Sequence, residues 1–189
     1  MKYSSGERSI NQWVDQAKMG NQQSARKIYD QYARAMYNIL YRMTRNEMEA
    51  QDLLQEAFIR AFRYLESFKG ESTFGAWLKR IVINTGLENQ RKRKPEWIEL
   101  DQHHDSLESK EEEINWTEIL RDVSLVRKAI LQLPEGTRNV LTLYLLEGYT
   151  HEEIGDLLGI SPSTSKTQYM RGKALVKDMI IKNHGKRFI

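Results

Sequence analysis

The spacing of apolar residues along the chain predicts a helical protein. Between residues 50 and 65, apolar side chains recur at intervals of three and four, as on one face of an amphipathic helix. The members of this face are Ala50, Leu53, Leu54, Ala57, Phe58, Ala61, Phe62 and Leu65. Similar spacing predicts a preceding helix over about residues 24–42 and a following one that starts near residue 73. Pro95 is expected to end that third helix, because the residue before a proline is disfavoured in the helical conformation.

A second set of helices is predicted in the C-terminal part of the chain. It covers residues 119–133 and 137–146 and two segments after residue 149, the last of which is expected to run to about residue 182. No segment has the alternation of apolar and polar residues that is typical of a half-buried strand. The predicted fold class is therefore all-α.

The last two helices have strong terminal signals. Thr150 and Glu153 have the spacing of a capping box, and Gly159 suits the left-handed position that follows a helix. Ser161 suits the N-cap of the final helix, with Pro162 at its first position. A short helix, a tight turn and a longer basic helix form the layout of a helix-turn-helix motif. A plain helical hairpin with a solvated polar face is the alternative interpretation.

Charge divides the chain more clearly than its modest net value of +3 suggests. Residues 79–94 hold six basic side chains against one acid, and residues 95–117 hold eight acids against one base. After residue 160 the sign changes again, with seven basic side chains against one acid. Because the acidic stretch lacks apolar periodicity, we expect two basic helical modules joined by a flexible acidic linker.

Several functional classes lack support in the sequence. The chain has no cysteine, so disulfides and thiolate metal sites are excluded. His103 and His104 lie in the acidic linker, where solvation is a better interpretation than a metal site. No run of about 18 apolar residues and no signal-peptide core is present, so we expect a cytoplasmic protein without membrane insertion. No catalytic arrangement or phosphate-binding loop is recognisable, so we expect neither an enzyme nor a cofactor.

Two helices are candidates for nucleic-acid binding. The final helix has hydroxyl, amide and cationic side chains in its first half that suit base edges and phosphates; they are Ser163, Thr164, Lys166, Thr167, Gln168 and Arg171. The third helix places Arg80, Asn84, Glu88 and Arg91 on one side, although an ordinary surface helix with a positive C-terminal end explains this pattern as well.

Four groups of motifs follow one another along residues 20–182: DLLQEAF at residues 52–58, FGAWLKRI at 74–81, LPE at 133–135, and the helix-turn-helix segment at 152–167. Together they resemble the signatures of the extracytoplasmic-function (ECF) sigma factors of bacterial RNA polymerase, within the sigma-70 family. The resemblance implies a sigma-2-like helical bundle over residues 1–94, an acidic linker over 95–117 and a sigma-4-like helix-turn-helix domain over 118–189.

The resemblance also implies partners and roles. Core RNA polymerase would be bound at the clamp helices of its largest subunit by Asp52, Gln55 and Glu56, and also at the flap of its second-largest subunit. Promoter DNA would be read at the −35 element by the final helix. The −10 element would be captured and held open by the loop at 67–73 and the third helix, through Phe68, Lys69, Ser72, Arg80, Asn84 and Arg91. An anti-sigma factor is a further expected partner.

Two residues depart from the pattern of this family. Ser165 stands where valine is frequent, which predicts looser packing of the final helix or a hydroxyl exposed to DNA. Glu88 stands where aspartate is common, and we expect its longer side chain to hydrogen-bond only within its own helix.

Two rival functions differ in class. One is a one-component helix-turn-helix regulator whose N-terminal half senses a ligand or dimerises, and the other is a nucleic-acid-processing enzyme. The motifs at residues 52–58 and 74–80 favour the sigma factor over the first rival. The lack of a catalytic or metal cluster in the sequence disfavours the second.

Overall fold

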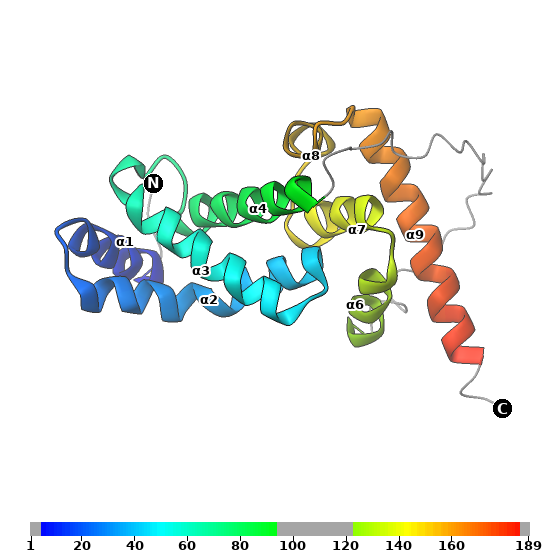
Figure 1. The fold of residues 1–189 in the computed structure, drawn as a ribbon, viewed down its shortest axis with the longest axis horizontal. Coiled ribbons are helices and arrows are strands. Elements are labelled where there is room, and N and C mark those ends of the chain that lie inside the picture. The colour runs from blue at the N-terminus through cyan, green and yellow to red at the C-terminus, as the bar shows by residue number, and fades with distance from the viewer. Residues whose placement is uncertain (1–4, 94–122, 186–189) are drawn as a thin grey trace. The chain divides into compact units, whose positions relative to one another are not determined.

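The computed structural model describes residues 5–93 and 123–185, with side chains over 9–93 and 125–181. The chain divides into two compact units, Met1–Arg93 and Lys94–Ile189. Within the described residues all regular structure is helical, which confirms the predicted all-α class (Figure 1). No described helix is long and apolar enough to cross a bilayer. The acidic segment 95–117, with His103 and His104, lies outside the described residues.

The first unit contains four α-helices and one short 3₁₀ turn in its described part. These elements are α1 (Ser5–Lys18), α2 (Gln22–Thr44), α3 (Glu47–Arg63), η1 (Leu65–Ser67) and α4 (Phe74–Arg93). α2 packs against α1, α3 and α4. Asn21 and Asn46 cap α2 and α3, each accepting a hydrogen bond from the backbone N–H three residues later. These caps satisfy amide groups that a helix N-terminus leaves without partners.

Helix α1 is an element that the sequence analysis did not predict, although Ile10, Trp13, Val14 and Ala17 have helical spacing. Its apolar contribution is small: Ile10 and Val14 are buried one turn apart, and most of its other described positions are at least partly exposed. α1 packs against α2 and η1. The periodic signal was therefore present in the sequence, and packing against α2 and η1 stabilises the helix.

The second unit forms its own core. Its described elements are α6 (Val123–Gln132), α7 (Glu135–Leu141), the π-helical turn η3 (Thr142–Leu146), α8 (His151–Leu158) and α9 (Pro162–Gly185). The core cluster joins α6, α7 and α9 and consists of Val126, Ala129, Ile130, Leu133, Leu141, Val176 and Ile180. The predicted helix over 137–146 is thus α-helical only to Leu141 and continues as a π-helical turn.

Two glycines allow close contacts in this unit. A Cβ atom at Gly172 of α9 would lie 2.3 Å from Leu141 Cδ1 of α7, so any larger residue would force the leucine side chain or the helices to shift. A Cβ atom at Gly155 of α8 would lie 2.8 Å from the backbone oxygen of Ile160. Glycine therefore permits the tight approach of α8 to the turn that precedes α9.

Candidate nucleic-acid interface

The helix-turn-helix geometry follows from local capping. The capping box of Thr150 and Glu153 is present at the start of α8, which confirms the sequence prediction. Gly159 ends α8 with φ of 71°, in the left-handed region. Ser161 then accepts a hydrogen bond from the N–H of Thr164 at 3.0 Å, so it caps α9 as predicted. These short-range contacts fix the turn between the two helices.

The predicted DNA-contacting side chains of α9 differ in their availability. Ser163, Lys166, Thr167 and Arg171 are exposed, whereas Thr164 and Gln168 are half-buried. Gln168 Oε1 accepts a hydrogen bond of 2.5 Å from Thr137 Oγ1 of α7. One end of the Gln168 amide is therefore occupied within the protein, while the exposed hydroxyl and cationic groups remain accessible to base edges and phosphates.

The structure corrects the expectation for Ser165. This residue is fully buried on the inner face of α9, and its hydroxyl lies 2.8 Å from Nδ1 of His151 at the start of α8. The serine hydroxyl is therefore a partner of a side chain in the preceding helix and is not presented to DNA. The sequence prediction lacked this partner because His151 is 14 residues away.

The loop between η1 and α4 combines a buried aromatic residue with an exposed polar rim. Phe68 is only 7% exposed, and its ring lies 5.4 Å from that of Phe74 and 5.5 Å from that of Trp77. Lys69 and Ser72 are exposed. Phe68, predicted as a −10 contact, is therefore a support for the loop in this structure, because its ring is covered by the aromatic cluster.

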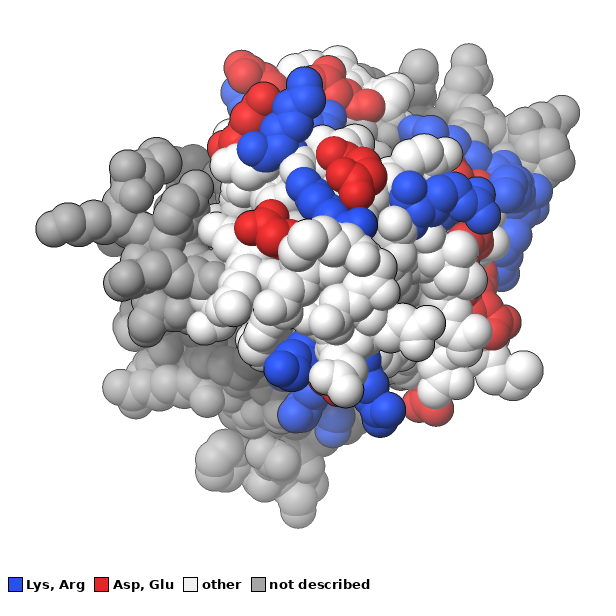
Figure 2. Space-filling model, turned by 90° about the vertical axis from the view of Figure 1, so that its left-hand side faces the viewer, with Lys and Arg blue, Asp and Glu red and all other residues white. Residues whose placement is uncertain are grey.

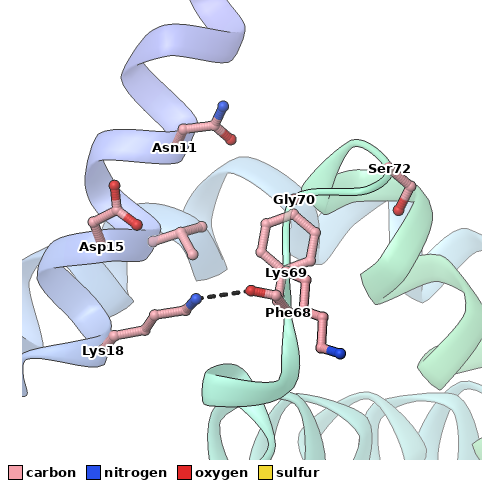
Figure 3. A pocket seen from close by; sticks show the side chains of 8 residues that line it. Asn11, Asp15, Lys18, Phe68, Lys69, Gly70 and Ser72 are labelled. Carbon is pink, nitrogen blue, oxygen red and sulfur yellow. Dashed lines mark hydrogen bonds between the residues drawn. The ribbon is translucent and has the colours of Figure 1, made fainter.

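A small cavity lies between this loop and α1 (Figure 3). Its volume is about 190 Å³, and its polar lining comes from Asn11, Asp15 and Lys18 of α1 and from Lys69, Gly70 and Ser72 of the loop. Lys18 Nζ donates a hydrogen bond of 2.8 Å to the backbone oxygen of Phe68 and lies 5.8 Å from the centre of its ring. Helix α1 therefore holds the loop in place, a role that the sequence analysis did not predict.

The polar side of α4 is linked to α3 by an ion-pair network. Arg80, Asn84 and Arg91 are exposed. Glu88 accepts a hydrogen bond of 2.6 Å from Arg60 of α3, which also binds Glu56 at 2.5 Å. The hydrogen bond to Glu88 is the main reason why the pKa of Arg60 is raised.

The expectation that Glu88 bonds only within its own helix is therefore wrong. α3 and α4 pack together, and this brings the two long side chains within reach.

The exposed side of α3 is partly apolar. Asp52 and Gln55 are exposed, while Glu56 is half-buried and engaged by Arg60. Met48 and Ile59 are 76% and 59% exposed, and each lies four residues from one of these polar side chains. Residues at this spacing share a helix face. The sequence already indicated this mixed face, because Met48 and Ile59 are apolar but lie outside the periodic apolar set of residues 50–65.

Charge on the α1 end of the first unit is mixed. On the face seen in Figure 2, Lys and Arg side chains stand in separate groups, several of them next to Asp or Glu, around a largely uncharged centre. This face has no continuous basic patch.

Family comparisons match both units. Sigma-70 region 2 matches residues 28–96, and sigma-70 region 4 matches residues 124–176. The ECF RNA polymerase sigma factor SigW of Bacillus subtilis is 33% identical over 187 residues, which cover 92% of this chain and 98% of SigW. The RNA polymerase sigma-H factor of Pseudomonas aeruginosa is 31% identical, with 87% of this chain and 90% of the relative covered.

Solved structures support the same fold. CnrH in complex with the cytosolic domain of CnrY matches with a TM-score of 0.55 and 21% identity, over 92% of this chain and 98% of the other. The sigma factor RpoE of Bartonella quintana, in complex with the anti-sigma factor NepR, matches with a TM-score of 0.54 and 20% identity, over 82% and 95%. Given the SigW match along nearly the whole chain, this protein belongs to the ECF sigma factors of bacterial RNA polymerase.

Proposed function

We propose that this sigma factor uses three separate surfaces to direct core RNA polymerase to its promoters. The first half of α9 reads double-stranded −35 DNA, the loop at 67–73 with α4 holds the opened −10 strand, and the exposed face of α3 binds the polymerase clamp helices. The observation that carries the proposal is the capped helix-turn-helix, which fixes one face of α9 inward and leaves Lys166 and Arg171 exposed.

The −35 surface is tested by the salt dependence of DNA binding. Each protein cation that neutralises a phosphate releases counterions when the DNA binds. Removing one such side chain therefore makes the plot of log affinity against log salt concentration less steep by about one unit. Lys166→Ala and Arg171→Ala are expected to do this on double-stranded promoter DNA. Lys128→Ala, which removes an exposed lysine from α6, is the matched control. Equal slopes for all four proteins, wild type included, would contradict the assignment of α9.

The −10 surface combines the exposed Lys69 and Ser72 with Arg80, Asn84 and Arg91 of α4. Extruding a base from duplex DNA costs a few kcal/mol, which binding of the freed strand can offset without ATP. Arg80→Ala is expected to reduce open-complex formation by the holoenzyme while leaving −35 duplex binding unchanged. A defect confined to −35 binding would argue against this surface.

The polymerase-binding surface is proposed to centre on Asp52 and Gln55, with Met48 and Ile59 adding apolar contact at its two ends. Asp52→Lys is expected to weaken holoenzyme assembly, because an exposed acid on a helix suits a basic partner. Glu66→Lys makes the same charge change on η1 and serves as the control, since Glu66 is also exposed. Glu56 is expected to contribute less, because Arg60 already binds it.

Two further partners are proposed on the basis of the relatives. A neighbour with the same fold is a sigma factor bound to an anti-sigma factor, so we infer that this chain is also held by one. We also infer contact of the second unit with the flap of the polymerase second-largest subunit and no bond-making chemistry in this chain. The one-component regulator is disfavoured, because the SigW match continues through the N-terminal half.

A further inference from the structure

We propose that His151 is a positioning residue for promoter reading, which acts through Ser165 to fix the rotation of α9 about its own axis. The inference rests on the proposed role of α9 as the −35 reader. It assigns a role to a side chain at the start of α8 that hydrogen-bonds to the inner face of α9.

The contact lies inside the reading segment of α9. Ser165 stands between Thr164 and Lys166 and is fully buried, and its Oγ lies 2.8 Å from Nδ1 of His151. A helix with its side chains is about 10–12 Å wide, so a rotation of about 20° displaces side-chain tips by roughly 2 Å. A hydrogen bond tolerates only a few tenths of an ångström. This bond therefore limits the rotation that sets where Lys166 points.

A ring cluster provides a second attachment one turn further along α9. The His151 ring stacks on Tyr144 of η3 with centroids 4.3 Å apart and planes 15° apart. Tyr169 of α9 meets the His151 ring edge-on at 5.7 Å and the Tyr144 ring at 4.6 Å. Since Ser165 and Tyr169 are four residues apart, they share a face of α9. His151 thus contacts two successive turns of the reading helix.

The charge state of His151 suits this role. Burial is the main cause that lowers its pKa, and the nearby Lys166 ammonium lowers it further. The other titratable groups that face the ring are the phenols of Tyr144 and Tyr169, of which Tyr169 has a pKa raised by burial. A neutral imidazole has one donor and one acceptor nitrogen, and a hydroxyl can serve either. The pair is therefore satisfied at neutral pH without adding a charge beside Lys166.

A purely structural role predicts a different order of mutant effects from a positioning role. His151→Phe keeps a ring for Tyr144 and Tyr169 but cannot hydrogen-bond to Ser165. His151→Asn loses the ring but places an amide near the position of Nδ1, where the bond can persist. If His151 only fills space, the asparagine variant is the more damaged one. If it positions α9, the phenylalanine variant is the more damaged one in sequence discrimination.

The experiment uses the full chain and a duplex selected from a randomised library by the wild-type protein. Discrimination is defined for each protein variant as its affinity for the selected duplex divided by its affinity for a duplex that differs at one base pair. For His151→Phe and Ser165→Ala we expect discrimination to fall about two- to tenfold, the range of one lost hydrogen bond. The double variant His151→Phe/Ser165→Ala should lose no more discrimination than either single variant, because both changes remove the same hydrogen bond. His151→Asn should retain more discrimination than His151→Phe, and the salt slope should stay unchanged because phosphate contacts remain.

Ile130→Val provides the control for general loss of stability. Ile130 lies on α6 and is fully buried in the core cluster against which Tyr169 also packs, but it belongs to neither the His151–Ser165 pair nor the ring cluster. This change typically costs about 0.5–1.5 kcal/mol. It should lower stability and leave discrimination as in the wild type. Wild-type discrimination in both His151→Phe and Ser165→Ala, or an equal loss in Ile130→Val, would overturn the positioning role. A wild-type chain that selects no sequence from the library would instead overturn the proposed role of α9.

Discussion

Gly172→Ala tests how closely the reading helix must approach α7. The added Cβ would lie 2.3 Å from Leu141 Cδ1 and 2.8 Å from Thr137 Cγ2. Carbon atoms in contact normally stay about 3.5–4.0 Å apart, so the helices would have to separate by roughly 1 Å. Overpacking of this kind costs about 1–3 kcal/mol, and the better helix propensity of alanine returns about 1 kcal/mol. The difference is a net destabilisation of about 0–2 kcal/mol. Because Leu141 is 1% exposed and cannot swing into solvent, we expect the upper half of this range, about 1–2 kcal/mol.

The measurement is urea unfolding of the full chain by circular dichroism, with hydrogen exchange of α7 and α9 amides as the local readout. Exchange should speed up in these two helices and remain unchanged in the first unit. In a Leu141→Ala background, which costs about 2–5 kcal/mol by itself, the main clash is absent and Gly172→Ala should become nearly neutral. Equal effects of Gly172→Ala in both backgrounds would refute the steric explanation.

Four further changes have defined outcomes. Asn46→Ala removes the α3 cap and should cost about 1 kcal/mol in urea unfolding, while Asn38→Ala, an exposed asparagine within α2, should cost less. Arg60→Met should cost about 1 kcal/mol, and its cost should shrink in 1 M salt, since the carboxylates that it binds are nearly half exposed. Lys18→Met should speed amide exchange in the loop at 68–72, with no change in α3. The lowered pKa of His151 means that the unfolded chain binds a proton more readily than the folded chain. Stability should therefore be full above the unfolded pKa of about 6.5 and fall as the pH drops below it, and His151→Phe should remove this contribution.

Local features of this protein were readable in the sequence. The apolar spacing of α3, the Thr150 capping box, Gly159 and the Ser161–Pro162 start of α9 all appear where the pattern predicted them. Each depends on residues within about one helical turn of one another. Such short-range interactions favour the same conformation in most tertiary settings, so they can be inferred without knowing the fold.

Other features were decided by contacts between distant segments. The ring of Phe68 is buried because Phe74 and Trp77 cover it. Glu88 hydrogen-bonds to Arg60, which is 28 residues away, and Ser165 hydrogen-bonds to His151 across the turn. A polar side chain can be exposed or buried with a partner, and the sequence near it does not distinguish these outcomes. The choice depends on which partner the packed helices bring within hydrogen-bonding distance, because a buried polar group without one is costly.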